Sequence, residues 1–228
     1  MPFSKLGLSA PITDAVKALG YEKPTSIQQK AIPIVLRGSN LIAAAQTGTG
    51  KTAGFVLPIL EKLSKGETQR KKRARAIILT PTRELALQVH QSIEAYGKNL
   101  SLRSMAMFGG VDYAPQKQAL IEGVDIVVST PGRLIDLYGQ RAIHFDEVEM
   151  LVLDEADKML DMALSIRLIR SSIACQKTFK ACCSQRRYQT QFVTWRKTLS
   201  LTLKRSPLRS TAHLSRTSSS GSLPSIKT

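Results

Sequence analysis

The sequence predicts an α/β protein with a central parallel sheet that helices cover on both faces. Between Ser9 and about Asp161, short apolar runs alternate with segments of helical period, as in strand–helix–strand units. The apolar runs are continuous, which is typical of strands buried on both faces. Each run ends in a polar cluster, and ligands bind at the carboxyl ends of strands in such sheets. We therefore expect the polar clusters to converge on one edge of the sheet.

The apolar runs predict the strands, and the segments between them predict the helices. We expect strands at 41–45, 76–80, 124–129 and 150–154, and helices at 9–19, 26–37, 51–63, 83–97 and 131–138. The clusters that follow the strands read Q-T-G-T-G-K-T, P-T-R-E, T-P-G-R and D-E-A-D. These clusters hold the candidate functional residues.

The charge of the chain is divided unevenly along its length. Residues 162–228 hold 13 of the 33 Lys and Arg and none of the 17 Asp and Glu, so most of the formal charge of +16 belongs to this tail. The basic run R-K-K-R-A-R at 70–75 is interpreted as a solvated loop rather than a nucleic-acid site. The end of the tail has the composition of a disordered segment.

Cysteine usage and hydropathy exclude several classes of protein. The 3 cysteines all lie in the tail, and two are adjacent, which suits neither a disulfide framework nor a zinc site. No apolar run reaches the roughly 18 residues of a membrane span, and the N-terminus lacks the apolar core of a signal peptide. We expect free thiols, no membrane association and a cytoplasmic location.

A glycine-rich segment, A-Q-T-G-T-G-K-T at 45–52, follows an expected strand and opens an expected helix. Gly48 and Gly50 allow backbone N–H groups to surround phosphates at the positive end of a helix. Lys51 can reach the terminal phosphates, and the Thr52 hydroxyl can bind Mg²⁺. The segment predicts a P-loop, although Ala45 stands where the general pattern has glycine. A plain glycine-rich turn is the alternative, and Lys-Thr in this register disfavours it.

Another expected strand ends in D-E-A-D at 154–157. Asp154 would hold Mg²⁺ through water, and Glu155 would orient or deprotonate the attacking water. Taken alone, these acids are equally consistent with a solvated turn or a helix cap. The P-loop elsewhere in the chain favours the metal site.

The remaining clusters stand in the order and spacing of one family. They are Phe3, which lies 17 residues before G-Y-E-K-P-T-S-I-Q (20–28), P-T-R-E-L-A (81–86), the Gly109-Gly110 pair and T-P-G-R (130–133). The chain resembles the first RecA-like domain of a DEAD-box ATP-dependent RNA helicase, most like the bacterial RhlE-type branch. The resemblance implies a Q-motif region at 1–29 and a RecA-like P-loop domain at 30–161.

The resemblance also implies ATP and Mg²⁺ as cofactors. Adenine would stack on Phe3 and hydrogen-bond to Gln28. The resemblance further places Ala45, Gln46, Thr47, Gly48, Thr49, Gly50, Lys51 and Thr52 around the nucleotide, Thr52 and Asp154 at the metal, and Lys51, Asp154, Glu155 and Asp157 among the catalytic residues.

RNA is the partner that the resemblance implies, through Pro81, Thr82, Arg83, Gly109, Gly110, Thr130, Pro131, Gly132 and Arg133. Hydroxyl, guanidinium and backbone N–H groups grip phosphates and sugars without reading bases. Thr82 and Thr130 are also candidates for helix caps, and the two roles are compatible. We expect a monomer with no metal other than Mg²⁺.

The resemblance ends near Met162. Members of the family continue with Gly-Phe, a helix, a strand that carries S-A-T and a second RecA-like domain. Here Ala163-Leu164 follows, and no S-A-T appears downstream. Overlapping codons, formed from the last base of one codon and the first two of the next, allow L-F-S-A-T across 182–187. We interpret 162–228 as an out-of-frame, poorly ordered tail, and the alternative is a genuine basic extension that binds RNA.

Loss of the S-A-T strand would leave the sheet without its last strand or strands and the tail irregular, with an exposed edge and marginal stability. The family implies an ATP-dependent RNA helicase, and this copy is expected to be truncated and inactive or weakly active. One alternative is an ATP- and RNA-binding fragment without helicase activity. The other is a nonspecific basic nucleic-acid-binding protein that acts through its tail.

Overall fold

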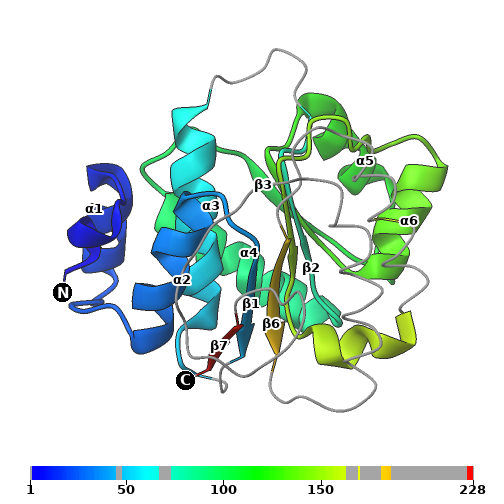
Figure 1. The fold of residues 1–228 in the computed structure, drawn as a ribbon. Coiled ribbons are helices and arrows are strands. Elements are labelled where there is room, and N and C mark those ends of the chain that lie inside the picture. The colour runs from blue at the N-terminus through cyan, green and yellow to red at the C-terminus, as the bar shows by residue number, and fades with distance from the viewer. Residues whose placement is uncertain are drawn as a thin grey trace.

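The computed structural model describes residues 2–44, 48–66, 73–162, 169, 181–185 and 225–227. This part of the chain builds a seven-stranded sheet in the order β3-β4-β2-β5-β6-β1-β7, with parallel pairing throughout (Figure 1). The strands are β1 Leu41–Ala44, β2 Ala76–Leu79, β3 Ser104–Met107, β4 Ile126–Ser129, β5 Met150–Leu153, β6 Ala181–Gln185 and β7 Ser225–Lys227.

Helices cover both faces of this sheet. Figure 1 shows α5 and α6 on one side and α1, α2 and α3 on the other. The helices are η1 Phe3–Leu6, α1 Ala10–Ala18, α2 Ser26–Leu36, α3 Lys51–Lys65, α4 Arg83–Gly97, α5 Ala114–Glu122, α6 Pro131–Gly139 and η2 Ala156–Met162. Within the described residues, none of these helices has the length and apolar character needed to span a membrane.

The side chains of the apolar strands pack into two separate core layers, one on each face of the sheet. Successive side chains of a strand point to opposite faces, so Ile78 of β2 packs with the helices α3 and α4, whereas Ile77 packs with α6. The same alternation holds in β4 and β5, whose residues are all buried. Burial on both faces explains why these strands read as continuous apolar runs, and the predicted α/β fold class is confirmed.

The sheet contains one strand that the sequence analysis expected to be absent. β6 lies between β5 and β1, and Cys183 is the register partner of both Leu153 and Ile42. A ladder joins backbone groups, so a segment without proline can supply a strand whatever its origin, and A-C-C-S-Q offers small, uncharged residues. The expectation of a sheet without its last strand is corrected here. Apart from Ile169, β6 and β7, the expected irregular tail beyond Met162 lies outside the described residues.

A buried carboxylate fastens the N-terminal segment to α3. Glu61 is 1% exposed, and its Oε2 accepts a hydrogen bond of 2.7 Å from the Ser9 N–H. Its Oε1 lies 2.6 Å from the Lys65 ammonium. Burial raises the pKa of the Glu61 carboxyl, but the hydrogen bonds from Lys65 and Ser9 outweigh burial and leave the pKa below the usual 4.5. The charged form of Glu61 is therefore the one that the fold stabilises.

We expect Glu61→Gln to lower the free energy of unfolding at neutral pH by about 1–3 kcal/mol, because the Ser9 N–H and the Lys65 ammonium lose their charged acceptor. A carboxyl whose folded-state pKa is lowered adds stability above its unfolded pKa, and that stability is lost as the pH falls through the folded pKa. Urea unfolding at neutral pH and at about pH 3 should therefore show a smaller pH effect in the variant than in the parent. Glu94→Gln, at a 62% exposed side chain, is the control. Equal losses in both variants would contradict this role of Glu61.

A second prediction concerns β6. Cys183→Pro removes an N–H from the middle of the sheet, and we expect it to lower the free energy of unfolding by at least about 2 kcal/mol. Cys183→Val keeps the N–H and suits a strand, so it should unfold close to the parent. Thermal and urea unfolding of the full chain measure the difference. Indistinguishable midpoints for the two variants would show that this strand carries no stability.

Candidate functional site

The P-loop and the acidic cluster leave the same edge of the sheet. β1 ends at Ala44 and β5 at Leu153, and β6 is the one strand between them. Neighbouring strands lie about 4.8 Å apart, so β1 and β5 are separated by about 10 Å. A Lys side chain and a metal-bound triphosphate together span such a gap. The topology therefore brings the two motifs within reach of one ligand.

Hydrogen bonds link the carboxyl ends of the other strands in series. The Asp154 N–H donates to the Leu79 carbonyl at 2.8 Å, and the Thr80 N–H donates to the Ser129 carbonyl at 3.0 Å. The Thr130 N–H in turn donates to the Met107 carbonyl at 3.3 Å. The acidic cluster and the three predicted RNA clusters thus form one continuous edge.

The described part of the P-loop has the backbone of a phosphate cradle. Gly48 and Gly50 have φ values of 83° and 80°, in the left-handed region that glycine adopts without strain. Helix α3 begins at Lys51, and no side chain caps it at Gly50. The first N–H groups of the helix therefore point to the position of a bound anion. Of the predicted loop, Ala45, Gln46 and Thr47 lie outside the described residues.

The start of α2 holds the P-loop from below. The Thr25 hydroxyl donates to the Thr49 carbonyl at 2.8 Å, and Gln28 Nε2 donates to the Gly50 carbonyl at 3.0 Å. The Gln28 carbonyl oxygen accepts from the Thr25 N–H at 2.9 Å. A Cβ atom at Gly50 would lie 2.3 Å from Gln28 Nε2, so this contact requires glycine. These hydrogen bonds therefore fix the P-loop to the Q-motif region.

The two residues expected at adenine both have structural contacts here. Gln28 is 1% exposed, with its amide bonded to Thr25 and Gly50. Phe3 is 5% exposed and packs in the core with Leu6 and Ile12. Contact of Phe3 and Gln28 with adenine stays a prediction.

The acidic cluster is buried and conformationally constrained. Asp154 is 6% exposed, and its Oδ1 accepts from the Glu155 N–H at 3.1 Å. Glu155 is 9% exposed and has φ 50°, a left-handed conformation that costs a non-glycine residue. Its Oε2 lies 2.7 Å from the Lys158 ammonium, and Asp157 is half-buried in the first turn of η2. Strained backbone and buried acids together are typical of functional sites.

The donor set of this edge fits a magnesium nucleotide. Carboxylate and hydroxyl oxygens are the protein ligands that Mg²⁺ prefers, and Asp154 and Thr52 offer both. Bound there, Mg²⁺ would neutralise the charge that develops on a transferring phosphoryl group.

On the RNA side, Thr82 and Arg83 open α4. The Thr82 hydroxyl caps the helix by accepting from the Leu85 N–H at 3.3 Å. Arg83 is exposed, and its guanidinium lies 4.9 Å from the centre of the Phe108 ring. Pro81 is half-buried before the helix. Capping and RNA contact therefore remain compatible at this helix start.

Arg133 behaves differently from Arg83. It is 8% exposed, its Nη2 donates to the Val111 carbonyl at 3.2 Å, and its guanidinium lies 4.6 Å from the Tyr113 ring centre. Around it, Gly109, Gly110 and Gly132 are exposed, Thr130 is the N-cap of α6, and Pro131 is buried in its first turn. In this structure Arg133 holds the loop that follows β3.

One residue that contacts this loop from α5 escaped the sequence analysis. Gln116 is 3% exposed, and its Nε2 lies 3.3 Å from the Phe108 carbonyl and 3.4 Å from the Asp112 carbonyl. Gln116 therefore ties together the two ends of the Gly109-Gly110 turn. A glutamine on a short helix directly after a glycine pair was the available signal, but a lone glutamine in a polar helix carries little weight.

Comparison with known proteins supports the resemblance to the helicase family. The family model described as DEAD/DEAH box helicase matches residues 25–194, which extends past Asp161 and includes β6. The ATP-dependent RNA helicase CshA of Listeria monocytogenes is 44% identical over 160 residues, covering 70% of this chain and 30% of that protein. CshA of Limosilactobacillus reuteri is 45% identical over 162 residues, covering 71% and 32%.

A solved structure agrees with the fold. The crystal structure of a hypothetical ATP-dependent RNA helicase from Sulfolobus tokodaii matches with a TM-score of 0.73 and 30% identity, covering 84% of this chain and 54% of that one. The chain spans about a third of the length of the two CshA proteins. The matched range, the motif order and the shared fold show that this chain belongs to the DEAD/DEAH box helicase family.

Proposed function

We propose that this chain is the ATP- and RNA-backbone-binding first domain of an ATP-dependent RNA helicase, and that alone it hydrolyses ATP at a near-background rate. The observation that carries the proposal is the position of the P-loop and D-E-A-D at one edge, one strand apart. Lys51 and the first turn of α3 would bind the phosphates, and Thr52 and Asp154 would hold Mg²⁺. Glu155 would orient the attacking water, with Asp157 beside it.

Binding of RNA would use the same edge of the sheet. Arg83, the exposed glycine N–H groups and the start of α6 offer donors for phosphates and sugars, which gives grip without base specificity. In a helicase, the transient closure of its two domains on ATP and RNA is coupled to strand separation. We therefore propose RNA-stimulated hydrolysis and local unwinding for a helicase with both RecA-like domains and not for this chain alone.

The low rate proposed for this chain has a physical cause. An arginine that a second domain supplies to the transferring phosphoryl group contributes roughly 10³ to 10⁵ in rate, or about 4–7 kcal/mol. This chain matches about a third of each CshA protein. It keeps the groups for binding, but we propose that the groups completing the transition state come from elsewhere.

Two interpretations of the tail are proposed. We propose that residues 162–228 arise from a shifted reading frame, because the shifted frame allows S-A-T where β6 supplies a strand. Sequencing of the coding DNA across the Met162 codon tests this, and an in-frame tail preserved in related genes would overturn it. A basic tail that binds nucleic acid without the helicase domain is the second candidate, which the absence of acids after Asp161 favours.

We expect the full chain to bind MgATP and Lys51→Ala to weaken binding at least about tenfold, because the ammonium contacts the terminal phosphates. Titration with a fluorescent ATP analogue measures binding, and Lys98→Ala, at an exposed lysine beyond α4, is the control. ATP turnover with and without single-stranded RNA should stay near background. RNA-stimulated turnover that Lys51→Ala abolishes would contradict the proposed lack of activity.

For RNA, we expect Gln116→Leu to reduce affinity for oligouridylate by about tenfold, because the Gly109-Gly110 turn loses the amide that joins its ends. Gln118→Leu on the exposed face of α5 is the matched control, since the Gln118 amide bonds to Glu122 of the same helix at 3.0 Å. Fluorescence anisotropy at fixed low salt measures both, with circular dichroism to verify folding. Equal affinities would remove Gln116 from the RNA site.

A further inference from the structure

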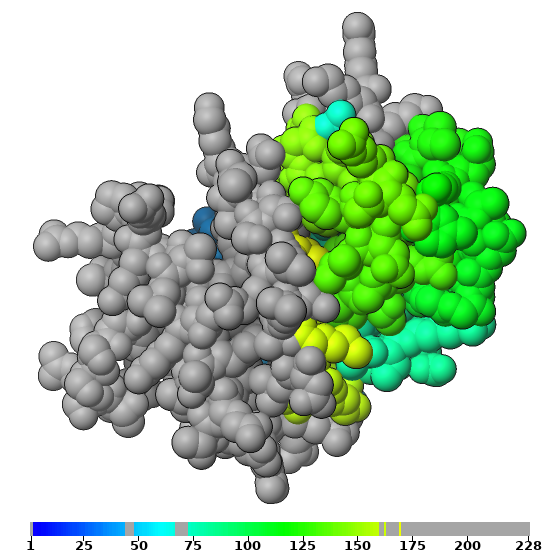
Figure 2. All heavy atoms as spheres, turned by 90° about the vertical axis from the view of Figure 1, so that its right-hand side faces the viewer, coloured from blue at the N-terminus to red at the C-terminus, as the bar shows by residue number. Residues whose placement is uncertain are grey.

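A cavity of about 410 Å³ lies at the opposite end of the strands from the motifs. Three residues of α5, the segment 140–144 after α6, and Arg73 with Ala74 before β2 surround it. Figure 2 shows α5 and α6, in green and yellow-green, side by side on this face. These boundaries lie where strands begin, whereas the P-loop, the acids and the RNA clusters follow strand ends. Its volume is within the usual range of ligand sites, about 300–1,000 Å³.

The rim of this cavity is cationic. Lys117, Arg141 and Arg73 contribute to the lining with exposed His144, and among the described residues that line it none is acidic. Arg73 pairs with Asp146, which offsets one of these charges. The basic run that ends at Arg75, interpreted from sequence as a solvated loop, therefore supplies part of the wall of a cavity. An anionic group is the complementary ligand.

The floor of the cavity is aliphatic. Leu120 and Ile143 line it, and Ile121 at its edge is 75% exposed, the highest value among the exposed large hydrophobic side chains of the described residues. Just beside the segment 140–144, Tyr138 stacks on Phe145 with ring centres 4.7 Å apart. Aliphatic and aromatic side chains next to arginine are the composition of protein-binding surfaces. An aliphatic floor offers no hydrogen-bond donor to a phosphate.

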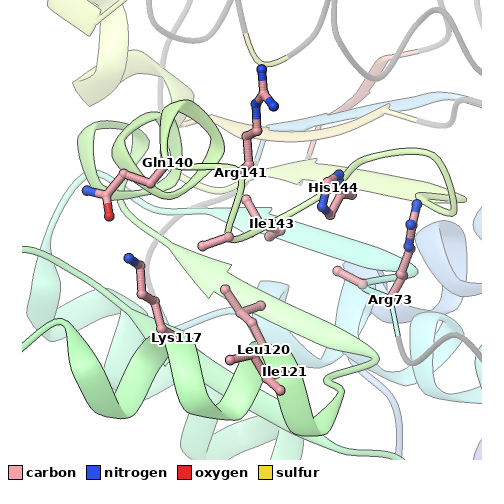
Figure 3. A pocket seen from close by; sticks show the side chains of 10 residues that line it. Arg73, Lys117, Leu120, Ile121, Gln140, Arg141, Ile143 and His144 are labelled. Atoms are coloured by element: carbon pink, nitrogen blue, oxygen red, sulfur yellow. The ribbon is translucent and has the colours of Figure 1, made fainter.

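Arg141 is held in a costly conformation at this rim. Its φ of 55° is left-handed, and the residue after a helix in this conformation is most often glycine. Figure 3 shows Lys117, Leu120 and Ile121 rising from α5, while Arg141 extends from the facing segment away from α5. The cations therefore extend beyond the cavity itself. That spread suits an extended ligand better than a compact one.

We propose that this cavity binds an acidic peptide segment of a protein partner. One apolar side chain of the peptide lies between α5 and Ile143, and its carboxylates face Lys117 and Arg141. The proposal does not depend on nucleotide binding, because the cavity and the P-loop lie at opposite ends of the strands. On the RNA side, the Lys117 ammonium lies 5.1 Å from the centre of the Tyr113 ring, which Arg133 also contacts, so RNA affinity is measured beside peptide affinity.

The test uses the full chain and a fluorescein-labelled synthetic peptide in which pairs of glutamates alternate with leucine. We expect saturable binding by anisotropy, and a loss of about tenfold or more in affinity for Lys117→Glu and for Ile121→Ser. Lys98→Glu beyond α4 and Leu87→Ser on α4 are the matched exposed controls, and both should bind as the parent does. Oligouridylate affinity should be the same in Ile121→Ser and the parent.

Three outcomes would overturn the proposal. The first is that Lys117→Glu, Ile121→Ser and the parent all bind the peptide with equal affinity. The second is equal binding of a peptide with serine in place of leucine, which would reduce the site to charge alone. The third is competition by oligouridylate that Lys117→Glu abolishes, which would make the cavity an RNA surface. Circular dichroism of each variant separates lost binding from lost folding.

Discussion

The spacing between β1 and β5 is the constraint on which the candidate site depends. β6 pairs with both strands, and Cys183 is level with Ile42 on one side and Leu153 on the other. Parallel strands on either side of a third are held about 10 Å apart, a gap that a Lys side chain and a metal-bound triphosphate together can span. The tail thus contributes the backbone of β6 to this spacing. In this sheet, β6 sets the spacing, whereas the two motifs follow β1 and β5.

Around that spacing, backbone carbonyls rather than side-chain pairs organise the site. Gln28 and Thr25 hold the P-loop by its carbonyls at Gly50 and Thr49. On the RNA side, Gln116 and Arg133 likewise hold carbonyls of the loop after β3. Such contacts fix the path of the chain and leave the N–H groups directed outward. Outward N–H groups are suited to phosphates, a chemical group that ATP and RNA share.

Prediction from sequence succeeded where burial leaves a strong pattern and failed where it does not. β2, β4 and β5 are buried on both faces, and α4 was expected at its observed bounds, 83–97. β3, S-M-A-M at the sheet edge, is mostly half-exposed and has no β-branched residue, and α5 buries little besides Gln116, so neither was expected. The motif residues were identified, but the burial of Phe3 and Arg133 depends on tertiary packing that no local pattern encodes. β6 shows the same limit, because ladder bonds are available to almost any sequence.

The position of Arg133 has a kinetic consequence. Its guanidinium is already committed to the Val111 carbonyl and the Tyr113 ring. A phosphate that takes the Nη2 donor of Arg133 would displace the Val111 carbonyl and release the loop that this contact holds. In the proposed RNA contact, association through Arg133 would therefore follow a local opening, whereas Arg83, exposed on its ring, would be available at first encounter. The exposed arginine would then set the encounter rate, and the buried one the lifetime of the complex.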